Sequence, residues 1–90
     1  MSAPVTTSWH VELDFYEDAD HTQATAIVRT PQGRELRGYG QARRNPADRP
    51  QPVLGEEVAG ARALSNLAHE LLEHAAREIE ENVRGQSSAA

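Results

Sequence analysis

The chain lacks cysteine and lysine entirely, and it has only four aromatic residues among its 90. The absence of cysteine excludes disulfide bonds and thiolate metal sites, and it agrees with a reducing compartment. No apolar run approaches the ~20 residues that a membrane-spanning helix needs. The N-terminal segment lacks the basic and apolar regions of a signal peptide. We therefore expect a soluble cytoplasmic protein with no membrane partner.

Bulky apolar side chains are also scarce. A single domain of this length buries only ~60–65% of the surface that its unfolded chain exposes, so its core is thin and its stability marginal. The N-terminal and C-terminal residues carry no apolar pattern. We expect one domain over residues 8–84, between loose tails at 1–7 and 85–90.

The charge is unevenly distributed. The formal net charge is −5, which argues against DNA and against general coating of nucleic acid. All nine basic residues are arginine, and five of them lie between Arg34 and Arg49, with only Glu35 and Asp48 against them. Arginine prefers planar partners such as carboxylate or phosphate. Codon bias in a GC-rich genome is the alternative explanation for this composition.

Three stretches have strand patterns, namely Trp9–Tyr16, Thr22–Thr30 and Arg34–Ala42. The first alternates apolar and polar residues with a period of two, which is typical of a half-buried strand. A Pro-Gln-Gly turn at residues 31–33 joins the last two strands. We predict an antiparallel meander.

Small residues dominate one side of the second and third predicted strands. Ala24 and Ala26 lie on the second strand, and Gly38 and Gly40 on the third. Glycine weakens a strand unless a close approach uses it. We therefore predict that a helix lies close over these two strands.

One long helix follows the meander. Gly55 is the predicted N-cap, with Glu56 and Glu57 at the positive end of the helix dipole, and Gly85 is the predicted residue after the last turn. Its apolar residues at helical spacing are Val58, Ala61, Leu64, Ala68, Leu71, Leu72, Ala75, Ile79 and Val83. The fold class is α+β, a three-stranded antiparallel meander followed by a long C-terminal helix.

The length of this helix bears on assembly. About 29 helical residues would span ~43 Å, whereas a compact globule of this size is roughly 31 Å across. We therefore expect the helix either to overhang or to break in two. An overhanging apolar stripe and a sheet with open edges favour a homodimer. The proline-bearing crossing Asn45–Leu54 is a candidate hinge for exchanging the helix between protomers.

No catalytic constellation stands out. His69 and His74 resemble zinc-protease ligands but lie ~140° apart around a helix, so they cannot easily share a metal. His10, Glu12 and Asp14 share the outer face of the first strand and are the weakest candidate, for a metal or a small ligand. We predict no enzyme activity, no cofactor and no metal.

Arginines of the third strand and the following loop are the best interaction candidates. Their positions suit RNA phosphates, and the predicted nucleic-acid-binding residues are Arg37, Arg43, Arg44 and Arg49. In the alternative interpretation Asp48 and Arg62 tie the loop to the helix, and the other arginines are simply solvated. A protein–protein adaptor that uses the helix end and Tyr39 is the second functional hypothesis.

These motifs together resemble a family of small actinobacterial proteins of unknown function. The run Gly-x-Gly-x-Ala-Arg-x-Asn-Pro-Ala-Asp at 38–48 is its most specific part, and the resemblance covers about Trp9–Leu72. The motif positions are Trp9, Gly38, Gly40, Asn45, Pro46, Asp48, Gly55 and Arg62. Glu56 departs from the family's usual Asp, and Gly60 interrupts a helix that is usually richer in Ala or Val.

The resemblance implies a function as well as a fold. The family includes a hypoxia-induced mycobacterial protein of the dormancy regulon, and its fold is similar to double-stranded-RNA-binding-like domains. At least one member resembles a ribosome hibernation promoting factor as a helix-swapped dimer. The resemblance therefore implies a non-enzymatic, dimeric stress or dormancy protein associated with ribosomes or RNA. It supplies no catalytic residues.

Overall fold

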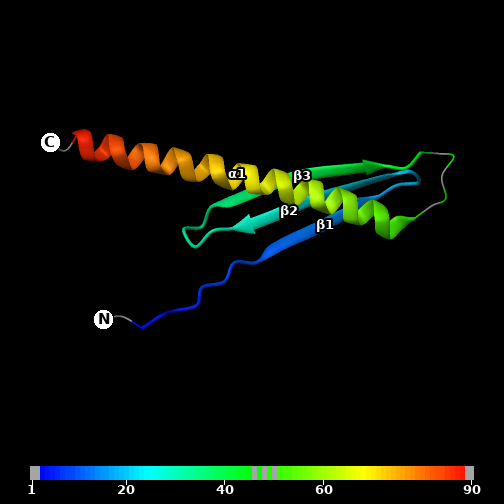
Figure 1. Cartoon of the computed structure of the whole chain (residues 1–90), viewed down its shortest axis with the longest axis horizontal. Helices are drawn as coiled ribbons and strands as arrows, with labels where there is room; N and C mark the ends of the chain where they lie inside the picture. Colours follow the sequence, from blue (N-terminus) through cyan, green and yellow to red (C-terminus); the bar gives the residue numbers. More distant parts are fainter. Residues whose placement is uncertain (1–2, 46, 48, 50, 89–90) are drawn as a thin grey trace.

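The structure, a computed structural model, describes residues 3–88 except 46, 48 and 50, with the backbone alone at 86–88. The elements follow one another as β1 (Val11–Glu17), β2 (His21–Arg29), β3 (Glu35–Arg43) and α1 (Pro52–Ser88). The strands form one antiparallel sheet in the order β1-β2-β3. Helix α1 crosses one face of this sheet (Figure 1). This is the α+β meander with a long C-terminal helix that the sequence predicts.

The predicted turn between β2 and β3 is confirmed. Gly33 has a φ of 85°, which glycine adopts readily because it has no Cβ. The backbone N–H of Thr30 donates to the carbonyl of Arg34 at 2.8 Å and closes the hairpin.

The core lies between α1 and the inner face of β2 and β3. Val28 is the largest fully buried side chain, so the core contains little bulk. Its buried residues are Ala24, Ala26, Val28, Ala59, Ala63 and Leu67. Helix α1 packs mainly on β3 and β2 and hardly touches β1.

Gly38 and Gly40 explain how such small residues form a core. A Cβ at Gly38 would overlap the backbone of Ala63 and lie 2.7 Å from the Cα of Leu67. A Cβ at Gly40 would lie 2.8 Å from the Cβ of Arg62. The backbones of helix and strand are therefore in direct contact, which confirms the predicted close approach over the second and third strands.

The predicted apolar stripe of the helix is partly wrong. The side that faces the sheet carries Ala63 and Leu67, whereas Leu64, Leu72 and Ile79 of the predicted stripe are exposed. One reason is the close approach at Gly38 and Gly40, which favours small side chains such as Ala63 on the facing side of the helix. Another is the overhang, where Ile79 has no sheet to face. The larger apolar side chains lie on the flank of the helix instead.

Helix α1 is longer than predicted at both ends, so both glycine caps were wrong. The helix begins at Pro52, since proline is tolerated at the first helical position. The N–H of Gly55 already donates to the carbonyl of Gln51 at 3.2 Å, inside the helix. At the other end the helix continues through Gly85 to Ser88, and Gly85 lacks the positive φ of a C-terminal cap. Glu56 and Glu57 consequently lie beyond the first turn.

The helix overhangs the sheet and does not break. Its 37 residues correspond to ~55 Å, and the molecule measures 65 × 33 × 17 Å. Figure 1 shows the C-terminal part of α1 projecting past the β2–β3 hairpin. Two ion pairs lie along the second half of α1, between Arg84 and Glu80 at 3.6 Å and between His74 and Glu78 at 3.1 Å. No helix in the described part of the chain is long and apolar enough to span a bilayer.

Candidate nucleic-acid interface

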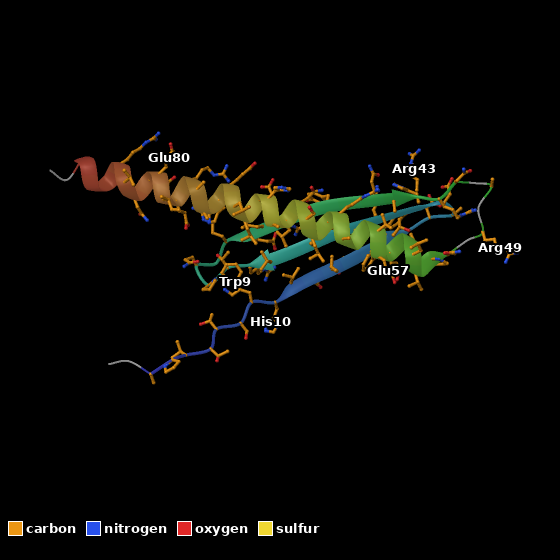
Figure 2. The ribbon with its side chains drawn as sticks, in the orientation of Figure 1. Trp9, His10, Arg43, Arg49, Glu57 and Glu80 are labelled. Atoms are coloured by element: carbon orange, nitrogen blue, oxygen red, sulfur yellow. The ribbon has the colours of Figure 1, made fainter. Side chains whose placement is uncertain are left out.

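Three of the four predicted RNA-binding arginines come together at one end of the molecule. Arg43 ends β3, and Arg44 and Arg49 lie in the crossing that leads to α1. Together with Arg62, these three arginines line an open cavity of about 470 Å³. The end of the β1–β2 hairpin forms the rest of its wall. Figure 2 shows Arg43 and Arg49 at this end of the molecule, away from the helix overhang.

The start of the crossing is held by one local hydrogen bond and one bond to the β1–β2 hairpin. The Oδ1 of Asn45 accepts from the backbone N–H of Ala47 at 3.1 Å, an Asx-type contact that is typical of turns. The backbone N–H of Arg44 donates to the carbonyl of Asp20 at 2.8 Å. These bonds fix Arg44 against the β1–β2 hairpin. The predicted motif residues Pro46 and Asp48 lie outside the described residues, and so does the predicted contact of Asp48 with Arg62.

Two side chains of α1 cap the outer edge of β3. Arg62 donates from Nη1 to the carbonyl of Gln41 at 2.7 Å, and Asn66 donates from Nδ2 to the carbonyl of Tyr39. Arg62 is the residue that the alternative interpretation of the sequence pairs with Asp48. Its bond to Gln41 shows that it ties the helix to β3.

Carboxylates share the concave end with the arginines. Glu17, Asp18 and Asp20 line it from the β1–β2 side. A hydrogen bond that protonated Glu17 donates to the Glu56 carboxylate is the main cause that raises the pKa of Glu17, and burial and the charge of Glu56 act in the same direction. The end therefore has mixed charge, with carboxylates on one side and arginines on the other.

Arg37, the fourth predicted arginine, lies apart from this group. It projects from the outer face of β3, where its Nε donates to Oε2 of Glu35 at 3.0 Å. Arg29 also pairs with Glu35, at 3.3 Å. The bond to Arg37 is the largest influence that lowers the pKa of Glu35, and the same bond raises the pKa of Arg37. The predicted set thus divides into three clustered residues and one distant residue.

The sequence-based reasoning named Tyr39 but missed Tyr16 as a functional candidate. Both tyrosines lie on the outer face of the sheet, 61% and 67% exposed respectively. The register of the sheet places Tyr16 opposite Gln23, and Gln23 opposite Gln41. The sequence already placed Tyr16 on the polar side of the first predicted strand, which suggests an exposed ring. Only the register shows that the two rings share one surface.

The structure also bears on the metal candidate. Among the residues that it describes, no three His, Cys, Asp or Glu side chains are placed to hold a metal ion. His10, Glu12 and Asp14 line only a shallow, open outer surface next to Trp9.

Comparison with known proteins identifies relatives over most of the chain. A family model described as Rv2632c-like matches residues 7–88. The Mycobacterium bovis "Uncharacterized protein Mb1767" is 41% identical over 80 residues, which cover 89% of this chain and 84% of that protein. The Mycobacterium tuberculosis "Uncharacterized protein Rv2632c" is 48% identical over 70 residues, covering 78% and 74% respectively. The crystal structure of Rv2632c matches with a TM-score of 0.81 at 36% identity, covering 90% of this chain and 95% of that one. The chain therefore belongs to the Rv2632c-like family.

Proposed function

We propose that this protein is a non-catalytic RNA-binding protein that acts as a homodimer, with ribosomal RNA as its target. The observation that supports this most is the convergence of Arg43, Arg44 and Arg49 on one concave end. Guanidinium groups bind phosphate oxygens in pairs, and phosphate contacts position a protein on nucleic acid.

The acidic net charge of −5 is compatible with a local RNA site. Exposed charges separated by more than about 10 Å are largely screened from each other at 0.1 M salt. The carboxylates of the helix overhang therefore have little effect on phosphates bound at the far end of the sheet. The same acidic surface keeps the protein from coating nucleic acid indiscriminately.

The uncovered apolar surfaces support a homodimer. Because α1 lies over β2 and β3, the inner face of β1 leaves Val11 and Phe15 more than 40% exposed. The overhang exposes Ile79 and Val83 as well. A second copy would supply matching apolar surface for both regions. Exchange of the helix through the crossing between β3 and α1 is the version of the dimer that we favour.

We further propose a role in stress or dormancy and a cytoplasmic location, on the strength of the family resemblance and of ribosomes as the target. Oxygen withdrawal should then raise the abundance of the protein in its native cells. Quantitative immunoblotting before and after the shift measures this, and an unchanged level would contradict the stress role.

Sedimentation with 70S ribosomes tests the RNA function. We expect the protein to co-sediment with ribosomes at low salt and to dissociate as salt is raised, because phosphate binding releases counterions. A triple variant, Arg43→Ala, Arg44→Ala and Arg49→Ala, should lose most of this binding. On a single-stranded RNA the slope of log K against log salt should fall by about 2, since each lost contact contributes ~0.7.

A second triple variant serves as the matched control. Arg34→Ala, Arg77→Ala and Arg84→Ala remove the same amount of charge from the β2–β3 turn and the second half of the helix. This protein should bind ribosomes as the wild type does. Absence of the wild-type protein from every ribosomal fraction at low salt would refute the proposal.

A protein–protein adaptor is the second candidate, and the exposed side chains of the overhang favour it. Leu72, Ile79 and Val83 form an apolar stripe on α1. A pull-down whose partner survives nuclease treatment, together with no ribosome binding, would favour the adaptor over the RNA-binding protein.

A further inference from the structure

We propose that the outer face of the sheet binds unpaired RNA bases by stacking them on Tyr16 and Tyr39. This inference rests on the RNA-binding function proposed above, and it specifies the kind of RNA that the protein prefers. The outer face is the one opposite α1, and no element in the described part of the chain covers it (Figure 1).

The register fixes the positions of the two rings. Tyr16 on β1 lies opposite Gln23, whereas Tyr39 on β3 lies opposite Thr25. The tyrosines are therefore on the two edge strands, one row apart along the sheet. Two strand spacings of ~4.8 Å separate the tyrosines across the sheet, and two residues of ~3.4 Å each separate them along it. Their Cα atoms are therefore about 12 Å apart.

The two tyrosines are the most exposed aromatic residues of the chain. Of four aromatic residues, two stand 61% and 67% exposed on the face that packs against nothing described. A ring that stands free on a sheet offers a flat π surface, which is how sheet-based RNA-binding domains hold bases.

The surface around the rings supplies hydrogen-bonding groups. Gln23 and Gln41 are both exposed and lie in the row of Tyr16. The Oε1 of Gln41 lies 2.8 Å from Nε2 of His21, so this contact does not use the amide NH₂ of Gln41. Amide groups donate and accept, which suits the edges of unpaired bases.

Positive charge flanks the same surface. On the outer face of β3, Arg37 lies two residues before Tyr39, and Arg43 lies after it at the end of the strand. The Tyr39 hydroxyl lies close enough to Arg37 to contribute to its raised pKa. A strand stacked on the rings would therefore have guanidinium groups near its phosphates at both ends. Arg43 joins this face to the arginine cluster at the concave end.

The spacing of the rings selects unpaired RNA over a duplex. Neighbouring bases of a stacked strand are only ~3.4 Å apart, so one strand reaches both rings only if its bases are splayed. Bases in loops and single strands can be splayed, whereas those of a helix cannot without breaking pairs.

Fluorescence anisotropy tests this with a labelled oligouridine of about 12 nucleotides, within the usual site sizes for single strands, and with an RNA duplex of equal length. The wild type should bind the single strand more tightly. Tyr16→Ala and Tyr39→Ala should each weaken this binding about fivefold to a hundredfold. Tyr39→Phe keeps the ring and should bind as the wild type does, whereas Tyr39→Leu keeps bulk without a π face and should bind as weakly as Tyr39→Ala.

A second readout does not depend on the variants being folded. In the wild-type protein, NMR signals of the ring protons of both tyrosines should shift upfield when oligouridine is added, because of the ring current of a stacked base. Binding that prefers the duplex, or that is insensitive to Tyr→Ala but lost in the Arg43, Arg44 and Arg49 triple variant, would overturn this inference and leave the proposed function standing. Absence of binding to both RNAs and to ribosomes would refute the two together.

Discussion

Gly38 sets the distance between strand β3 and helix α1. Replacing it with alanine would force a methyl group into the backbone of Ala63 and Leu67, and backbone atoms cannot move aside as a flexible side chain can. We expect Gly38→Ala to lower the free energy of unfolding by about 3 kcal/mol or more. Urea denaturation followed by circular dichroism measures this. A loss below about 1 kcal/mol would show that the helix tolerates being lifted from the sheet.

Gly60 is a matched comparison for Gly38, because replacing it with alanine should stabilise the protein. A Cβ at Gly60 would lie 3.4 Å from Cζ of Phe15 and 3.9 Å from Cδ1 of Leu13, which is close to ordinary packing. Alanine is also favoured over glycine by ~1 kcal/mol in the interior of a helix. We expect Gly60→Ala to raise the free energy of unfolding by about 1 kcal/mol in the same urea experiment. A loss of stability would mean that Phe15 cannot yield at this contact.

The contact between Glu17 and Glu56 should make stability depend on pH. Because the folded-state pKa of Glu17 lies above its ordinary value of 4.5, the folded chain retains a proton that the unfolded chain has already lost. The contribution of this contact is therefore fully present below pH 4.5 and is lost as pH rises through the folded-state pKa.

Glu17→Gln removes this titration, so the stability of the variant relative to the wild type should increase over that pH interval. Urea denaturation at a series of pH values from 4 to 7 measures the difference. Glu57→Gln, an exposed change of the same charge in the same part of α1, is the control. A difference between Glu17→Gln and the wild type that is constant with pH would contradict the prediction.

Among the elements, the two edge strands of the sheet differ in how their outward-facing backbone groups are covered. On the β3 edge, carbonyls of Tyr39 and Gln41 accept hydrogen bonds from Asn66 and Arg62 of the helix, and a capped edge resists pairing with another strand. In the described part of the chain, no corresponding side-chain bond covers the β1 edge. The β1 edge is also the one beside the exposed apolar residues, so it is the side that a second copy would meet.

Removing both caps should open the β3 edge. The double variant Arg62→Ala and Asn66→Ala should lose about 1–2 kcal/mol of stability and should form larger species at high concentration because unpaired strand groups become available. Dynamic light scattering across a concentration series measures this. Ser65→Ala, which lies between the two positions and is exposed, should behave as the wild type does. Equal particle sizes for the double variant and Ser65→Ala would show that the caps do not protect the edge.

The strands were predictable from sequence to within about two residues, because alternation along Trp9–Tyr16 and the Pro-Gln-Gly turn depend on local chemistry alone. The helix ends were not, since glycine is only a statistical marker of caps and nothing packed against Gly55 or Gly85 requires a break there. The buried side of α1 also required the structure. Leu64 looks like a core residue until the backbone contact at Gly38 is known.

The candidate site shows the same division between local and long-range information. The grouping of Arg43, Arg44 and Arg49 followed from their proximity in the chain, so it could be predicted. The separation of Arg37 from them, and the shared surface of Tyr16 and Tyr39, depend on strand register. Register is set by pairing across the sheet, which one strand's pattern does not reveal.

For the molecule as a whole, the dimer is the assembly that most needs testing. The radius of gyration of the single chain is 18.6 Å. This exceeds the ~12 Å of a compact chain of the same length, because the overhang extends beyond the sheet. Analytical ultracentrifugation should show a dimer of the wild type at micromolar concentration. Ile79→Glu places a charge in the apolar stripe, where burial without a partner is unfavourable, and should weaken dimerisation about tenfold or more.

The position of Ile79 makes this variant informative. Its side chain is 64% exposed and lies in the overhang, so the fold of the single chain should be unaffected and its circular dichroism unchanged. Arg77→Glu, an exposed change on a different side of the same turn, should leave the dimer intact. A wild-type protein that sediments as a stable monomer at micromolar concentration would contradict the proposed assembly.

The order of the elements along the chain has a last consequence. All three strands precede the crossing and the whole helix follows it, so one cleavage between Asn45 and Gln51 would separate the two layers into independent peptides. The helix and the sheet are held together by direct backbone packing and not by the segment that connects them. The two peptides should therefore recognise each other when mixed, and the helix peptide could serve as a probe for unoccupied sheets of its own kind.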